Sequence, residues 1–213
     1  MRVALAFIRK ELAGIYSPEE IDSLIFLIFE RVKGYSRTQF LMAKEEVLCD
    51  DETEQFLEIV ARLKKHEPIQ YIFGQTEFYS LPFYTSPGVL IPRPETEELV
   101  QWIIQETVKE TPSILDVGTG SGCIAVALKK NLTEAAVWAC DISPESIDTA
   151  RKNAALNQVE INVVEYDILN QSPRAEFPIF DIIVSNPPYV RESEKVQMEK
   201  NVLEYGLSKL FGK

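Results

Sequence analysis

The residues with the clearest chemical potential form an Asn-Pro-Pro-Tyr turn at 186–189, directly after an apolar run at 180–185. Proline has no N–H to donate and fixes φ near about −65°, so the carbonyls of Asn186 and Pro187 lack helical or sheet partners. The Asn186 side chain adds a carboxamide oxygen, and Tyr189 adds a flat ring with a polar tip. These groups suit a planar NH₂ group, which predicts a site for an amide or an exocyclic amine. The alternative is a turn that only ends a strand.

The glycine-rich segment Asp-Val-Gly-Thr-Gly-Ser-Gly at 116–122 is a second chemical signal. Glycines let a ligand approach the backbone closely, and the N–H groups that open the next helix can bind a carboxylate. Asp141 ends the following predicted strand, where its carboxylate can bind both ribose hydroxyls of a nucleoside. Asp167, after the third predicted strand, can accept from an adenine amino group, with Ile142 and Ile168 covering the ring.

The spacing of the glycines distinguishes two classes of cofactor. A dinucleotide site needs Gly-x-Gly-x-x-Gly, whereas Gly118, Gly120 and Gly122 alternate here and Cys123 takes the third glycine position. This spacing disfavours NAD. S-adenosylmethionine, a nucleoside with an amino-acid tail and no pyrophosphate, fits better because the loop can hold the tail carboxylate. Together with an acceptor site for NH₂, this cofactor indicates methyl transfer to nitrogen.

The elements that position these groups alternate between strand and helix. Strand patterns occur at 113–117, 136–140, 161–166 and 180–185, with helical patterns at 123–131 and 144–157. This alternation predicts a mostly parallel, doubly wound sheet, in which ligands bind beyond the carboxyl ends of the strands. The polar candidates all lie at or just beyond those ends: Asp116, Asp141, Asp167 and Asn186.

Residues 1–67 are predicted to form a separate helical domain. Ser-Pro-Glu-Glu at 17–20 has the pattern of a capping box before an apolar helical face, and Ser36 with Gln39 predicts a second helix start. The domain contains no catalytic constellation, so packing or docking of a partner is its expected role.

A linker at 68–92 is predicted to contain a β-hairpin, because 70–74 and 77–79 are rich in aromatic and β-branched residues. The remaining domain spans 93–213. Glu95 and Glu97 fall in the first turn of a helix, where acidic residues favour the helix dipole. The sequence leaves two roles equally open for Glu95 and Glu97: stabilising this helix end and taking part in the active site.

Composition narrows the class of protein. The 213 residues are 46% hydrophobic and 26% charged, as in an ordinary soluble globular protein, and charges at 9–11 come too early for a signal peptide. We therefore expect no membrane association and a cytoplasmic location. The net charge of −11 disfavours direct, sequence-specific nucleic acid binding. No metal site or disulfide framework is expected, and three residues are predicted to be small buried packing groups: Cys49, Cys123 and Cys140.

Three motifs behind a helical domain closely resemble the PrmC (HemK) family: Ile-Pro-Arg-Pro-Glu-Thr-Glu at 91–97, the glycine segment at 116–122, and Asn-Pro-Pro-Tyr at 186–189. These are S-adenosylmethionine-dependent enzymes that methylate the side-chain amide of the glutamine in the Gly-Gly-Gln motif of peptide chain release factors. Asn-Pro-Pro-Tyr alone is shared with methylases of adenine, cytosine and guanine amino groups, whereas the combination of motifs is specific. The implied fold is a Rossmann-like α/β methyltransferase sheet.

The resemblance implies cofactor contacts from Gly118, Thr119, Gly120, Ser121, Gly122, Asp141, Asp167, Ile168 and Asn186. It implies that the glutamine amide is held by Asn186, Pro187, Pro188 and Tyr189, and we assign catalysis to Asn186, Pro187 and Tyr189. Direct in-line transfer is the hypothesis. An amide nitrogen is a poor nucleophile, so acceptance of both its N–H groups by Asn186 and a turn carbonyl would orient it and stabilise developing charge.

The sequence departs from the family at its C-terminal end. The family sheet has seven strands, but four are predicted here, and 206–213 replaces the Glu-Pro continuation usual after Tyr205. A truncation or reading-frame change would leave 180–185 as an edge strand. Three functions remain open. The first is a release factor glutamine methyltransferase or its cofactor-binding portion. The second is a nucleic-acid amino-group methyltransferase, which would need a basic groove that the sequence does not indicate, and the third is an inactive fragment that does not bind cofactor.

Overall fold

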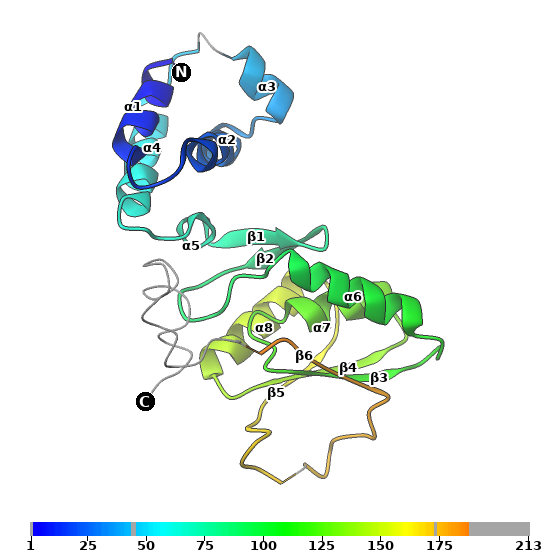
Figure 1. Cartoon of the computed structure of the whole chain (residues 1–213). Coiled ribbons are helices and arrows are strands. Elements are labelled where there is room, and N and C mark those ends of the chain that lie inside the picture. Colours follow the sequence, from blue (N-terminus) through cyan, green and yellow to red (C-terminus); the bar gives the residue numbers. More distant parts are fainter. Residues whose placement is uncertain (1, 44–45, 173, 188–213) are drawn as a thin grey trace. The chain divides into compact units, whose positions relative to one another are not determined.

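The computed structural model describes residues 2–43, 46–172 and 174–187. The chain divides into two compact units, Met1–Phe73 and Gly74–Lys213, and each has a hydrophobic core of its own (Figure 1). Among the described residues, no helix is long and apolar enough to cross a lipid bilayer.

Helices build the first unit, and the helix starts predicted at Ser17 and Ser36 are confirmed as capping boxes. The Ser17 N–H donates to the Glu20 carboxylate at 2.9 Å, and the Ser36 N–H donates to the Gln39 side-chain oxygen at 2.9 Å. Such reciprocal caps satisfy N–H groups that have no partner within a helix. The helices of this unit are α1 Arg2–Leu12, α2 Pro18–Lys33, α3 Arg37–Met42, α4 Asp50–Leu63 and α5 Ile69–Phe73.

One predicted element is wrong. Residues 70–73 of the run at 70–74, expected to be the first strand of a hairpin, belong to the short helix α5. Ile69 is buried, and Ile72 and Phe73, three and four residues later, pack against the same helical core. The Pro68 carbonyl accepts from the Ile72 N–H at 3.1 Å, which closes a helical turn. Burial at helical spacing thus outweighs the strand preference of aromatic and β-branched side chains.

The hairpin follows α5 and opens the second unit. Its antiparallel strands are β1 (Gln75–Phe78) and β2 (Leu81–Tyr84). Tyr79 and Ser80 form the turn with φ values of 51° and 57°. Positive φ at both central residues is characteristic of type I′ turns, which usually take Asn or Gly. The Tyr79 N–H donates to the Glu97 carboxylate at 2.8 Å, so the following helix stabilises this turn.

The four predicted strands of the second unit are confirmed. Within the described residues they form a parallel sheet in the order β5-β4-β3-β6. The order therefore reverses between β3 and β6, which is the switch point of the sheet. Val117 lies opposite both Cys140 and Ser185, and Asp141 lies opposite Glu165, so the four carboxyl ends meet at one edge. The elements are α6 Glu95–Glu106, β3 Ser113–Val117, α7 Cys123–Asn131, β4 Ala136–Asp141, α8 Pro144–Leu156, β5 Asn162–Glu165 and β6 Ile182–Ser185.

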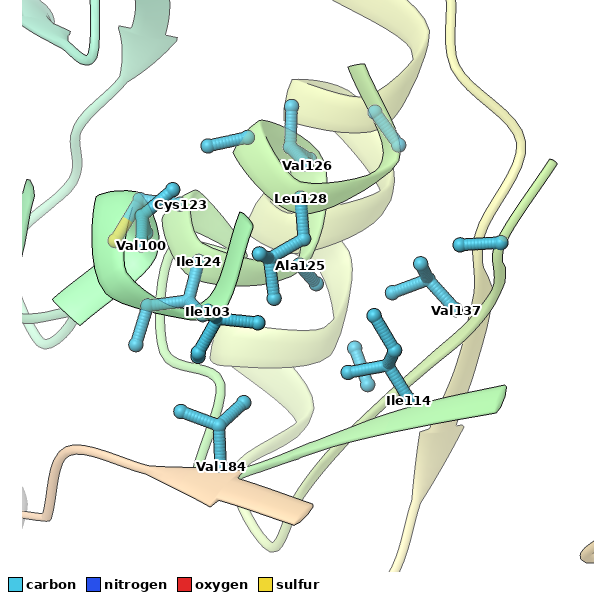
Figure 2. Packing of buried hydrophobic residues seen from close by; sticks show 14 of the residues in the cluster. Val100, Ile103, Ile114, Cys123, Ile124, Ala125, Val126, Leu128, Val137 and Val184 are labelled. Atoms are coloured by element: carbon cyan, nitrogen blue, oxygen red, sulfur yellow. The ribbon is translucent and has the colours of Figure 1, made fainter. Parts of the chain in front are cut away.

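Helices α6, α7 and α8 cover one face of the sheet (Figure 1). Figure 2 shows Ile114, Val137 and Val184 pointing from their strands toward side chains of α6 and α7, among them Ile103 and Leu128. Leu128 and Ile114 are completely buried. Burial of large aliphatic groups on this face supplies most of the driving force that holds the strand ends in place.

The other face differs from a doubly wound sheet. Within the described residues it is covered by the connection between β5 and β6 rather than by helices. Phe177 packs edge-on against Trp138 and Tyr166, with ring centroids 5.4 and 5.1 Å apart. The sequence Asn-Gln-Ser-Pro at 170–173 and Pro178 favour turns over helix in this segment. Aromatic side chains here replace the expected helical layer.

The prediction for the cysteines holds at two of three positions. Cys123 and Cys140 are buried, whereas Cys49 is exposed directly before α4, where its side chain lies outside the helical core. Among the described residues, no three His, Cys, Asp or Glu side chains cluster as metal ligands do.

Candidate active site

The glycine loop joins β3 to α7 at the switch point. The Gly118 N–H donates to the Cys140 carbonyl at 2.8 Å, which attaches the loop to the neighbouring strand. A Cβ at Gly122 would lie 2.9 Å from the Ala150 Cβ, so this glycine permits close packing of α7 on α8. By contrast, a Cβ at Gly118 would meet nothing within 4 Å, and one at Gly120 only the Val89 Cγ1 at 4.0 Å. Open space therefore lies against the backbone of these two glycines, as a cofactor tail requires.

Asp116, near the end of β3, stabilises the glycine loop through a hydrogen bond. Its Oδ2 accepts from the Thr119 hydroxyl at 2.6 Å, and its Oδ1 is buried and forms no hydrogen bond of normal geometry within the described part of the chain. Burial raises the pKa of Asp116 to about 7, although the Thr119 hydroxyl and the Ala125 backbone N–H favour the charged form. Asp116 is thus a buried support of the loop.

Asp141 lies beside the loop at the end of β4. Its Oδ2 accepts from the Gly120 N–H at 2.9 Å, and its Oδ1 accepts from the Ser143 N–H at 2.9 Å. An ionised carboxylate has about four acceptor sites, so both oxygens retain capacity for a hydroxyl. The two backbone bonds orient the carboxylate between the loop and α8, which fits the expected contact with a ribose.

Asp167 follows β5 at the same edge of the sheet. Its carboxylate accepts from the Asn170 side chain at 2.8 Å and from the backbone N–H of Leu169 at 3.0 Å, and these bonds lower its pKa. Ile142 and Ile168, next to Asp141 and Asp167, are 65% and 44% exposed. Two uncovered apolar side chains at the ends of adjacent strands suit a flat ring such as adenine.

Asn186 lies near both the glycine loop and the segment 91–97, which is called the proline-rich motif below. Its Nδ2 donates to the Thr96 Oγ1 at 2.8 Å, across 90 residues of sequence. Pro187 is exposed, and Pro188 and Tyr189 lie outside the described residues. A cavity of about 50 Å³ is lined by parts of all three motifs: Leu90, Ile91, Pro92, Arg93, Thr96, Gly118, Thr119, Gly120, Ser121, Cys123, Ile124 and Asn186. The structure therefore brings together the three motifs that carry the family resemblance.

One positioning residue was not predicted, and the role of a second had been left open. Asn153 is completely buried in α8; it accepts from the Tyr84 N–H at 2.7 Å and donates to the Ser121 carbonyl at 2.8 Å. Glu97, whose role was open, accepts a hydrogen bond from the backbone N–H of Tyr79 in the hairpin turn. The sequence did carry a signal for Asn153, which lies on the apolar face of a helical pattern. Asn is unfavourable inside a helix unless its side chain forms hydrogen bonds with groups outside that helix.

The comparisons with known proteins match the sequence of both units. The model of the PrmC N-terminal domain matches residues 4–74, and that of the methyltransferase small domain matches residues 94–210. The release factor glutamine methyltransferase of Flavobacterium psychrophilum is 47% identical over 198 residues, which cover 91% of this chain and 69% of the relative. The enzyme of that name from Bacteroides thetaiotaomicron is 44% identical over 94% of this chain and 71% of its own length.

Among solved structures, a ribosomal protein L11 methylase from Lactobacillus delbrueckii subsp. bulgaricus is 35% identical, with a TM-score of 0.40, over 48% of this chain and 51% of that one. The two family models and the sequence relatives together match both units. The chain belongs to the release factor glutamine methyltransferase family.

Proposed function

We propose that this chain transfers the methyl group of S-adenosylmethionine to the side-chain amide nitrogen of the glutamine in a release factor Gly-Gly-Gln motif. The observation that carries the proposal is the convergence of the glycine loop, the proline-rich motif and Asn186 around one cavity. A release factor takes part in translation, so we place the reaction in the cytoplasm. We assign docking of the protein substrate to the helical unit.

The residues at the carboxyl edge of the sheet fit the cofactor. The open backbone at Gly118 and Gly120 would hold the amino-acid tail, and Asp141 would bind the ribose hydroxyls. Asp167 would accept from the adenine amino group, with Ile168 against the ring. When bound, S-adenosylmethionine supplies an electrophilic methyl group.

The chain's own contribution is orientation of the amide and stabilisation of charge. The Asn186 side-chain oxygen and a carbonyl of the turn would each accept one N–H of the glutamine amide. These bonds draw electron density toward the nitrogen and hold its lone pair in line with the methyl group. The methylated amide nitrogen carries an extra proton and is a strong acid, so this proton is lost to water after the transfer. The mechanism therefore needs no general base beside the nitrogen.

A methyl-labelling assay with the purified chain tests the proposal. We expect label from S-adenosylmethionine on an intact release factor and none on a release factor whose Gly-Gly-Gln glutamine is replaced by alanine. Label on DNA instead would favour a nucleic-acid amino-group methyltransferase. Absence of both labelling and cofactor binding in a calorimetric titration would identify an inactive fragment and overturn the proposal.

A further inference from the structure

Thr96 accepts a hydrogen bond from the side chain of Asn186, which directly follows β6. It lies in the first turn of α6, is 6% exposed, and its N–H donates to the Arg93 carbonyl at 3.0 Å. Prolines at 92 and 94 restrict the backbone immediately before it. The hydroxyl that meets Asn186 therefore has a defined position.

The two ends of a carboxamide differ chemically, because the oxygen accepts and the nitrogen donates. Rotation of the group by about 180° around its last bond exchanges these ends with little change in shape. Only the orientation with the oxygen toward the substrate can accept from the NH₂ of a glutamine. The opposite orientation would place two NH₂ groups against each other. Efficient transfer therefore requires the Asn186 side chain to be held with its oxygen toward the substrate.

We propose that Thr96 is a positioning residue that holds the Asn186 side chain in this orientation; the inference rests on the function proposed above. The Thr96 hydroxyl accepts from the Asn186 nitrogen, which places this end of the carboxamide at α6. In the proposed role the carboxamide oxygen, at the other end, accepts from the incoming amide. Thr96 acts through Asn186 and contacts neither methyl donor nor acceptor in this role. The Ile-Pro-Arg-Pro-Glu-Thr-Glu motif thus contributes a hydroxyl to the chemistry of the distant Asn-Pro-Pro-Tyr turn.

A purely structural bond between α6 and β6 is the competing explanation. These elements already pack through Val100, Ile103 and Val184, which are buried in the same cluster (Figure 2). Loss of one hydroxyl should therefore change the melting temperature by at most about 4 °C in a protein of this size. An effect on turnover without an effect on stability separates the two explanations.

The test compares Thr96→Val, which removes the hydroxyl and keeps the shape, with Thr96→Ser, which keeps the hydroxyl. We expect kcat to fall at least about tenfold in Thr96→Val, with little change in KM for the release factor, and to stay within about threefold in Thr96→Ser. Thr107→Val is the matched control, because the Thr107 hydroxyl donates to the Ile103 carbonyl at the other end of α6. It should leave kcat unchanged.

A double-mutant cycle shows whether Thr96 acts through Asn186. Thr96→Val should add no further loss to Asn186→Ala, because the group that it positions is already absent. An unchanged kcat in Thr96→Val, or the same loss in both backgrounds, overturns the inference.

If the wild-type chain does not methylate a release factor, the proposed function fails, and NMR of the Asn186 side-chain amide still decides the contact. Its ¹⁵N–¹H signals, assigned by their loss in Asn186→Ala, should shift in Thr96→Val and persist in Thr96→Ser. Unshifted signals in Thr96→Val overturn the inference.

Discussion

The glycine loop and the Asn186 turn line one cavity, but the fold holds them differently. Backbone and side-chain groups of two other elements bond to the loop: the Cys140 carbonyl and the Asp141 carboxylate from β4, and the Asn153 amide from α8. The Asn186 side chain donates to the Thr96 hydroxyl of α6. The cofactor side of the site is therefore built into the core, whereas the substrate side depends on individual side chains. Substitutions in the loop should cost mainly stability, and substitutions at the turn should cost mainly turnover.

Asp116 provides the largest expected effect on the loop. Its pKa is about 7 in the folded chain against an ordinary 3.8, so the folded state retains a proton that the unfolded chain has released. Stability from this group is full below about pH 4 and is lost as the pH rises to about 7, by up to about 4 kcal/mol. Urea unfolding at several pH values should show this loss in the wild type and its absence in Asp116→Asn. Parallel profiles for the two proteins would contradict the assignment.

Gly122→Ala should be the next most disruptive change. The new Cβ would lie 2.9 Å from the Ala150 Cβ at a φ of 79°, so strain and overlap combine to a cost of about 3 kcal/mol. Gly118→Ala is the matched control, because its φ is also positive but its Cβ would enter open space, for about 1 kcal/mol. Denaturant unfolding measures both. Equal losses would show that packing between α7 and α8 is not the reason for glycine at 122.

Asn186→Ala should show the opposite behaviour at the turn. Loss of a group that acts in the transition state lowers turnover by ~100-fold, equivalent to about 2.7 kcal/mol, with little change in unfolding free energy. Methyl transfer to a release factor measures the effect. Asn131→Ala, which removes a comparable amide bonded to the Ala127 carbonyl at the end of α7, should keep full turnover. Near-normal turnover of Asn186→Ala would remove Asn186 from the mechanism.

Asp141→Asn should have the smallest of these effects. A neutral amide weakens a charge-assisted bond to a ribose hydroxyl, and we expect about tenfold lower affinity for S-adenosylmethionine by calorimetry. Turnover at saturating cofactor should change less. Asp148→Asn, which alters an exposed carboxylate of α8 paired with Lys152, is the control with expected normal affinity. Wild-type affinity in Asp141→Asn would refute the ribose contact.

Much of the sheet was predictable because its signals are local. Apolar runs that end in Asp or Asn identified the strands, and the helix at 123–131 was predicted with its observed bounds. The helix α5 was not, because Ile72 and Phe73 favour a strand locally, whereas in the structure they pack at helical spacing in the core of the first unit. The pairing of Thr96 with Asn186 was also beyond sequence patterns, since no periodicity relates residues 90 positions apart.

The parallel register between β3 and β6 has a consequence for insertions and deletions. Because Val117 pairs with Ser185, the residues that follow them, Gly118 and Asn186, emerge side by side. Removal of a single residue from β6 would turn the Asn186 position to the opposite face of the sheet. The site would then be lost although every functional side chain is still present. Homologues should therefore vary in length within the connection at 166–181 and keep a constant number of residues through β6.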